Sequence, residues 1–209
     1  MTEKPSPESI FERVLQYTDA DDRTICLDEM RKKRDVGLIP EAMYDELRGD
    51  KTIMEYVRSD AYPFEEVLAI ALVASERKTG NVYKLEKAMK NEHPVIRYWG
   101  AVGCSALAHH KVGLPTELLE KLLEDESAAV RITAAEALGR DLEGTPFFEK
   151  AIAAIKKELG TKHDMIVLHA LNALDQLGEE AKLDKAEIAL IKKNKLGYSN
   201  RMAEKAGHH

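Results

Sequence analysis

The pattern of apolar and polar positions along this chain is helical, and it becomes regular after residue 63. Apolar residues recur every three or four positions, whereas glycine and proline fall mostly between the periodic segments. Three helical hairpins are predicted: 81–90 with 94–108, 115–124 with 127–140, and 146–159 with 164–177. An apolar helix over 64–76 precedes them, and a last helix is predicted over 182–193. The pattern therefore predicts an all-α fold.

The second segments of these hairpins resemble one another in sequence. Residues 130–139 are matched in type by residues 96–104 and by residues 166–174, and a step of 34 residues separates Arg97 from Arg131. Self-similarity at such a period, on helix-forming sequence, is typical of stacked helical hairpins. We therefore predict an α-α superhelix, a HEAT/armadillo-like solenoid of helical hairpins.

The regularity of the pattern divides the chain into three parts. Residues 1–60 are predicted to form an irregular N-terminal helical region, with short helices at about 40–47 and 52–58. Residues 61–197 carry the HEAT-like hairpins, and residues 198–209 form a C-terminal tail whose two closing histidines are consistent with the remnant of an affinity tag.

Charged residues predict contacts between successive hairpins. Arg97 and Arg131 occupy equivalent positions near the starts of two second helices, and Glu92 and Asp125 precede them in the turns. Arginine binds carboxylates in a bidentate manner, so we predict a ladder in which turn carboxylates bond to arginines of neighbouring repeats. The third hairpin keeps Asp164 but has valine at the arginine position, and the ladder is expected to end there.

The charge and the apolar content of the sequence argue against some classes of binding partner. The chain carries 37 acidic and 31 basic residues, for a net charge of −6, and 44% of its residues are hydrophobic. Nucleic-acid scaffolds normally show a basic excess or a basic face, so no nucleic-acid partner is expected. The sequence has no long apolar run and no hydrophobic signal core at its start, so no membrane partner is expected either.

Catalytic chemistry has little support in the sequence. The metalloprotease, P-loop, nucleophile-elbow and dinucleotide-binding motifs are all absent. Cys26 and Cys104 have no histidine at a diagnostic spacing, and we interpret both as small buried hydrophobes. We expect no catalytic residue and no cofactor in this chain.

Histidines are the candidate metal ligands: His93, His109, His110, His163 and His169. A zinc site needs three or four convergent ligands, whereas only His109 and His110 are adjacent and they point to different sides of a helix end. We favour solvated loop histidines and expect no metal.

Candidate partner contacts lie on the second helices, which usually face the concave side of such arrays. They are Arg97, Arg131, Glu136, His169, Asn172 and Asp175. Two further features have a functional and a structural interpretation, and we favour the structural one for each. The basic run 31–34 is interpreted as a solvated helix end rather than a polyanion patch, and Tyr98-Trp99 as core rather than a ligand surface.

One segment is more specific than a generic repeat. Arg34-Asp35-Val36-Gly37-Leu38-Ile39-Pro40-Glu41 resembles the junction at which the catalytic core of bacterial sulfatases, of the arylsulfatase/sulfamidase type, gives way to a C-terminal extension. Segments 93–103, 130–139, 168–178 and 198–205 resemble the HEAT-type repeats and the close of that extension, so the resemblance covers roughly residues 20–205. The Cys/Ser-x-Pro-x-Arg signature and the calcium-binding aspartate cluster of the family's core are not in this sequence.

The resemblance implies a non-catalytic accessory domain that packs on a sulfatase core in cis, in the periplasm or outside the cell; the location is otherwise open. This hypothesis predicts an exposed apolar or well-matched face around residues 34–41. A free-standing HEAT-repeat scaffold for another protein predicts instead that every face is compatible with solvent. A third hypothesis, an enzyme similar to the alkylpurine DNA glycosylases, needs a basic groove with aromatic residues, which the net acidity and the single tryptophan disfavour.

Overall fold

A computed structural model describes residues 31–32, 34, 36–108, 113–142, 144–178 and 182–193. All the regular elements in this part of the chain are helical, which confirms the predicted fold class. The elements are η1 (Val36–Leu38), α3 (Glu41–Leu47), α4 (Ile53–Arg58), α5 (Phe64–Ser75), η2 (Thr79–Asn81), α6 (Val82–Met89), α7 (Pro94–Leu107), α8 (Thr116–Leu122), α9 (Ala128–Asp141), α10 (Pro146–Glu158), α11 (Asp164–Leu177) and α12 (Lys185–Lys193).

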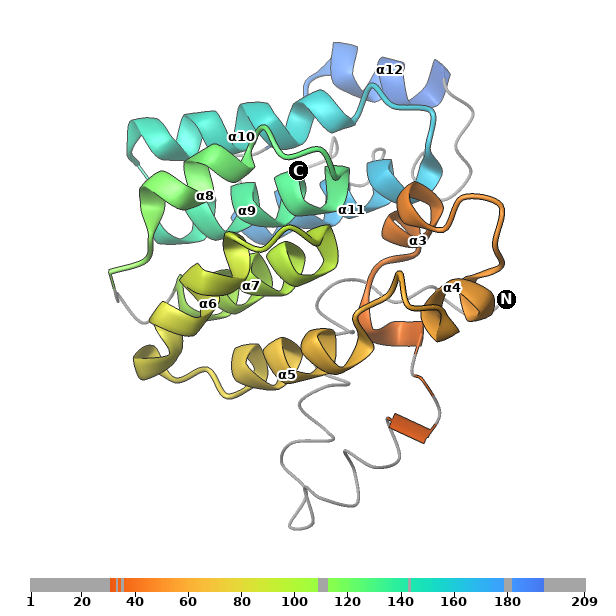
Figure 1. Cartoon of the computed structure of the whole chain (residues 1–209). Helices are drawn as coiled ribbons and strands as arrows, with labels where there is room; N and C mark the ends of the chain where they lie inside the picture. Colours follow the sequence, from red (N-terminus) through yellow and green to blue (C-terminus); the bar gives the residue numbers. More distant parts are fainter. Residues whose placement is uncertain are drawn as a thin grey trace.

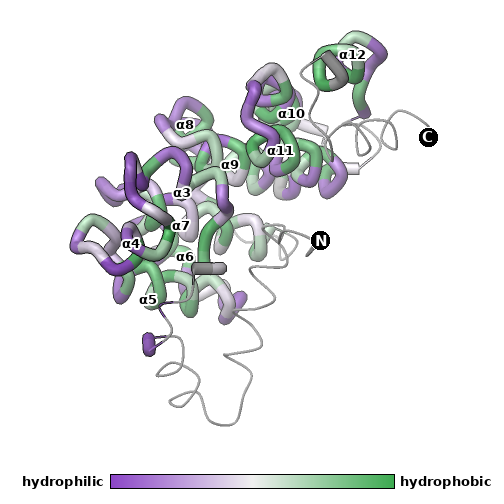
Figure 2. The backbone as a smooth tube through the Cα atoms, turned by 90° about the vertical axis from the view of Figure 1, so that its right-hand side faces the viewer, coloured by the Kyte–Doolittle hydropathy of each residue, from purple (hydrophilic) through white to green (hydrophobic). Residues whose placement is uncertain are grey.

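The helices stack in two layers (Figure 1). Helices α5, α7, α9 and α11 form an inner layer, in which each helix contacts the next one in sequence order. Helices α6, α8 and α10 form an outer layer against α7, α9 and α11, and α12 lies beyond α10 (Figures 1 and 2). Each predicted hairpin therefore contributes one helix to each layer, as in an α-α superhelix.

Small residues allow the layers to pack closely. Ala101 and Ala135 of the inner layer have no exposed surface. A Cβ atom at Gly100 would lie 2.7 Å from Met89 Cγ and 2.9 Å from the Met89 backbone nitrogen. Helix α7 therefore approaches α6 at a distance that only glycine permits at position 100.

One hydrophobic cluster runs through the described residues, from Leu38 to Ile191. In Figure 2 the apolar residues line the contacts between helices, whereas hydrophilic residues gather at the turns. Trp99 and Cys104 are fully buried in this cluster, as predicted for both. No helix in the described ranges has the length and apolar character that a membrane crossing requires.

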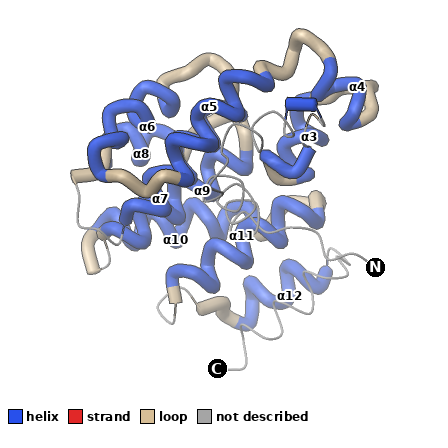
Figure 3. The backbone as a smooth tube through the Cα atoms, turned by 90° about the horizontal axis from the view of Figure 1, so that it is seen from below, coloured by secondary structure: helices blue, strands red, loops and turns tan. Residues whose placement is uncertain are grey.

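The segment 36–62, which we call the strap, crosses the array instead of extending it. Its α3 contacts α9 and α11 (Figure 3), and its η1 contacts α4 and α5. Tyr44 of α3 and Tyr56 of α4 pack edge to face, with ring centroids 6.3 Å apart, and Tyr62 continues this cluster to Phe64 of α5. The strap is thus anchored to both ends of the inner layer.

An exposed apolar face around residues 34–41 was expected if a sulfatase core packs there, and this expectation is wrong for the apolar residues described. Leu38 and Ile39 are each 2% exposed, because they belong to the hydrophobic cluster. Arg34 stacks over the ring of Phe64, with its Cζ 4.8 Å from the ring centroid.

Several predictions lie outside the described residues: those for Cys26, His109, His110 and the tail 198–209. The division of the chain into residues 1–60, 61–197 and 198–209 stays a prediction.

The stacking can be tested with Ala135→Glu. Ala135 has no exposed surface, so a carboxylate there is buried without a partner and is expected to lower the free energy of unfolding by roughly 3 kcal/mol or more. Ala153→Glu, on the exposed side of α10, is the matched control and should change it by no more than about 0.5 kcal/mol. Urea denaturation measures both, and an unchanged midpoint for Ala135→Glu contradicts the stacking.

Candidate interaction surface

The first rung of the predicted arginine ladder is present. Arg97 Nε donates to Asp125 Oδ2 at 2.7 Å and Arg97 Nη2 donates to Asp125 Oδ1 at 2.9 Å, which is a bidentate pair between neighbouring hairpins. Nη1 of the same arginine donates to the backbone carbonyl oxygens of Asn91 (3.1 Å) and Glu92 (2.7 Å). Asp125 is thus the turn carboxylate that was predicted, whereas Glu92 contributes its carbonyl oxygen.

The second rung uses a different acid from the one predicted. Arg131 donates to Glu158 through Nε–Oε1 at 2.7 Å and Nη2–Oε2 at 3.0 Å. Its Nη1 donates to the carbonyl oxygens of Asp125 and Glu126, as Arg97 does one repeat earlier. Glu158 is the last residue of α10, so its carboxylate reaches the arginine before the chain enters the turn that leads to Asp164.

Both arginines are committed to the ladder. The side chain of Arg97 is 11% exposed and that of Arg131 is 21% exposed. The hydrogen bonds to Glu158 raise the pKa of Arg131 above its ordinary value. Val167 takes the arginine position in the third hairpin and is fully buried. The two arginines join hairpins, and their role as partner contacts stays a prediction.

A row of polar side chains joins the C-terminal halves of three inner-layer helices. Ser105 Oγ of α7 donates to Glu136 Oε1 of α9 at 3.0 Å, and Arg140 pairs with Glu136 at 3.1 Å. Arg140 Nη2 then donates to Gln176 Oε1 of α11 at 2.6 Å. We call these four residues the C-terminal row.

The other predicted contact residues of α11 flank this row. Asn172 is half-buried, and Asp175 is exposed beside Gln176. Glu136 belongs to the row itself, and its side chain is 12% exposed.

His169 was predicted to be a solvated loop histidine, and this is wrong. It lies within α11 and is 3% exposed. Its Nε2 is 3.4 Å from Thr133 Oγ1, and its ring packs edge to face with Tyr98 at a centroid distance of 6.5 Å. Burial lowers the pKa of His169 to about 4, so the ring is neutral at physiological pH.

His93 and His163 lie in turns, as expected of loop histidines, but both are half-buried and have structural partners. His93 precedes α7, where its Nδ1 accepts a hydrogen bond from Val95 N at 3.2 Å and its Nε2 lies 3.1 Å from the carbonyl oxygen of Ala61. His163 precedes α11 and its Nε2 lies 3.3 Å from Asp45 Oδ2. The described residues hold no group of three side chains able to bind a metal ion.

The strap contacts the array through Glu46, a residue that sequence reasoning missed. Ser127 Oγ donates to Glu46 Oε2 at 2.5 Å, and the backbone nitrogen of Ala128 donates to Glu46 Oε1 at 3.0 Å. Glu46 keeps much of its surface exposed, but loss of solvent where its carboxylate meets α9 raises its pKa, and both hydrogen bonds oppose that change. A serine directly before α9 signals a helix start, but nothing in the sequence indicates an acid 81 residues away as its partner.

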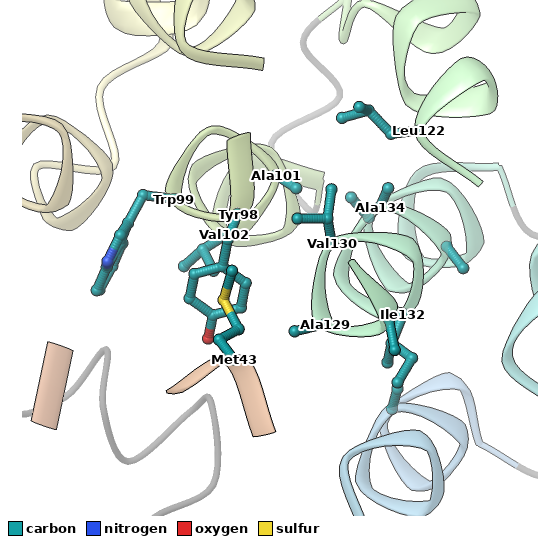
Figure 4. Close-up of a cluster of buried hydrophobic side chains, with 14 of the residues drawn as sticks. Met43, Tyr98, Trp99, Ala101, Val102, Leu122, Ala129, Val130, Ile132 and Ala134 are labelled. Atoms are coloured by element: carbon teal, nitrogen blue, oxygen red, sulfur yellow. The ribbon is translucent and has the colours of Figure 1, made fainter. Parts of the chain in front are cut away.

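Met43 completes this contact. In Figure 4 its side chain rises from α3 toward Tyr98 of α7, with Val102 and Ala129 nearby. Met43 and Tyr98 have no exposed surface, so α3 covers this part of the inner layer.

Comparison of the sequence with known protein families identifies the type of helical repeat. Residues 115–196, which span α8 to α12, match the family model of HEAT repeats. No curated protein matches the chain. The chain therefore carries a HEAT-type helical repeat, and the two-layer stack together with this match supports a helical-repeat scaffold.

The ladder can be tested with Arg131→Ala. The change leaves Glu158, whose side chain is 9% exposed, without its cation and should lower the free energy of unfolding by about 2–4 kcal/mol. Lys90→Ala removes a solvent-exposed pair with Glu86 and should cost no more than about 0.5 kcal/mol. Equal midpoints for the two variants in urea denaturation would show that the rung does not hold the hairpins together.

His169 should make the fold sensitive to acid. Because its folded pKa lies below its ordinary value of 6.5, the neutral ring contributes stability that is fully present above that pH and is lost as the pH falls toward 4. The loss amounts to roughly 3 kcal/mol. Urea denaturation at pH 7 and pH 4.5 should therefore show a smaller decrease for His169→Gln than for the wild type. His163→Gln, at a half-buried ring, is the comparison variant, and an undiminished decrease in His169→Gln contradicts the assignment.

Proposed function

We propose that this chain is a non-catalytic scaffold that binds a protein partner through the C-terminal row and the adjacent Asn172 and Asp175. The observation that carries the proposal is the division of the inner layer. Helix α3 packs on the N-terminal ends of α9 and α11, whereas the C-terminal halves present hydrogen-bonded polar groups of both charges.

Such a row suits a polar protein interface. Gln176 and Asp175 are exposed, and the Glu136 and Arg140 side chains keep 12% of their surface accessible while they hold each other in place. Side chains already fixed by hydrogen bonds lose little further entropy when a partner binds. The row therefore offers preorganised donors and acceptors.

The finer proposal is that the partner is the catalytic core of a sulfatase, joined to this chain in one polypeptide. Its support is the resemblance of residues 34–41 to the junction segment of bacterial sulfatases, together with the repeat motifs that follow. In this arrangement the described helices would shape access to the core or hold it in an assembly.

The alternative is a free-standing scaffold for a separate protein. The burial of Leu38 and Ile39 favours it, because these two apolar residues of the junction segment then need no core to cover them.

The gene around the segment that encodes Met1 distinguishes these proposals. An upstream reading frame in phase, with the Cys/Ser-x-Pro-x-Arg signature, supports the accessory domain, whereas a stop codon before Met1 supports the free-standing scaffold.

The binding surface is tested by charge reversal. If the upstream core exists, it is produced separately and titrated with this chain by calorimetry. Asp175→Lys should weaken binding at least tenfold, about 1.4 kcal/mol. Glu117→Lys makes the same change at an exposed position of α8 in the outer layer and should leave the affinity unaltered.

For a free-standing scaffold, a photo-crosslinker at position 175 should capture the native partner while one at position 117 does not. Equal effects at the two positions, in either experiment, would contradict the proposed surface.

A further inference from the structure

The strap contacts the N-terminal ends of three successive inner-layer helices. The residue before each helix is His93 for α7, Ser127 for α9 and His163 for α11. The strap supplies one oxygen to each of them: the Ala61 carbonyl to His93, the Glu46 carboxylate to Ser127 and the Asp45 carboxylate to His163. The contacts thus follow the period of the repeat.

Two of these oxygens belong to adjacent carboxylates of α3. The N-terminal ends of helices carry partial positive charge and unpaired backbone N–H groups, and Glu46 uses one of them, the nitrogen of Ala128. The spacing of α9 and α11 therefore suits a short helix with two consecutive acids. Helix α3 demonstrates this fit within the chain.

The contact with α3 leaves the hydroxyl group of Tyr98 unsatisfied. Tyr98 Oη is buried, has no hydrogen-bond partner among the described residues, and belongs to the side chain that Met43 approaches (Figure 4). A thioether sulfur is only a weak acceptor, whereas a buried hydroxyl normally has a partner. A helix with an amide side chain at the Met43 position could accept this hydrogen bond.

We propose that the N-terminal ends of α9 and α11, together with Tyr98, form a docking site for an acidic helix of a partner protein, which α3 occupies in cis. The partner helix carries two adjacent carboxylates and a hydrogen-bond acceptor at the position equivalent to Met43. The proposal rests on the scaffold function proposed above but uses a different surface, at the other end of the inner-layer helices from the C-terminal row.

Because α3 belongs to the same chain as the docking site, it competes with a partner helix for that site. A segment joined to its site by a short linker acts at an effective concentration in the millimolar range, so a free helix of equal fit displaces little of it. Binding of a partner therefore requires either a better fit, such as one that satisfies Tyr98, or release of the strap. Access to the site is controlled by the chain itself.

The test uses the full chain and two fluorescein-labelled peptides: one with the sequence of residues 38–50, and the same peptide with Met43→Gln. In Asp45→Lys/Glu46→Lys, two cations face the positive ends of α9 and α11 and weaken the cis contact. Fluorescence anisotropy should show that the first peptide binds this variant at least tenfold more tightly than it binds the wild type. The Met43→Gln peptide should bind more tightly again, by about threefold or more.

Two controls isolate the site. Asp50→Lys reverses an exposed acid just beyond α3 and should bind the peptides as the wild type does. Adding Ser127→Ala and His163→Ala to Asp45→Lys/Glu46→Lys should remove the gain in affinity. If the peptides bind all variants equally, the docking site is refuted.

A measurement on the wild-type chain avoids variants that fold poorly. An excess of the Met43→Gln peptide should displace α3 and accelerate hydrogen exchange of the α3 amides severalfold. Unchanged exchange at saturating peptide overturns the proposal. Asp175→Lys should leave peptide binding unaltered, so failure here is distinguishable from failure of the C-terminal row.

Discussion

The bidentate pair between Arg97 and Asp125, repeated one hairpin later by Arg131 and Glu158, is the interaction on which the array depends. Each arginine bonds to the carbonyl oxygens of the turn before its own helix and to a carboxylate of the following hairpin. It therefore fixes the turn and sets the position of the next repeat at once. The acids are nearly buried, so solvent screens the pairs little. The bidentate geometry strengthens each pair further.

Close packing of the helices then determines which surfaces the array offers to a partner. Glycine and alanine bring the layers together, so the bulky residues of the cluster fill the space between them. Among the described residues, the large apolar side chains that stay exposed are Met54, Tyr83 and Leu190. The N-terminal ends of the inner-layer helices project their unpaired groups at one edge, where the acids of the strap meet them. The opposite ends carry the C-terminal row. Both surfaces are consequences of parallel stacking of equivalent helices.

The sequence predicted the hairpins and the arginine ladder, and particular residues show which features it could not predict. The helical period located the hairpins to within a few residues, and the equivalence of Arg97 and Arg131 predicted the ladder. Glu158 was missed because its role depends on where α10 ends, and His169 because a histidine at an inner-layer position looks the same in sequence whether buried or exposed. The sulfatase resemblance contributed a specific segment, yet its apolar residues pack inward against the cluster.

The sequence by itself determined the local structure: helix positions, hairpin pairing and the small residues that permit stacking. These depend on interactions between residues close in the chain, whose spacing is visible directly. Only the tertiary structure decided that Glu46 meets Ser127 and that Tyr98 lies against Met43. Such contacts depend on how the chain returns across the array, which is set by the packing of all the helices together and leaves no periodic trace in the sequence.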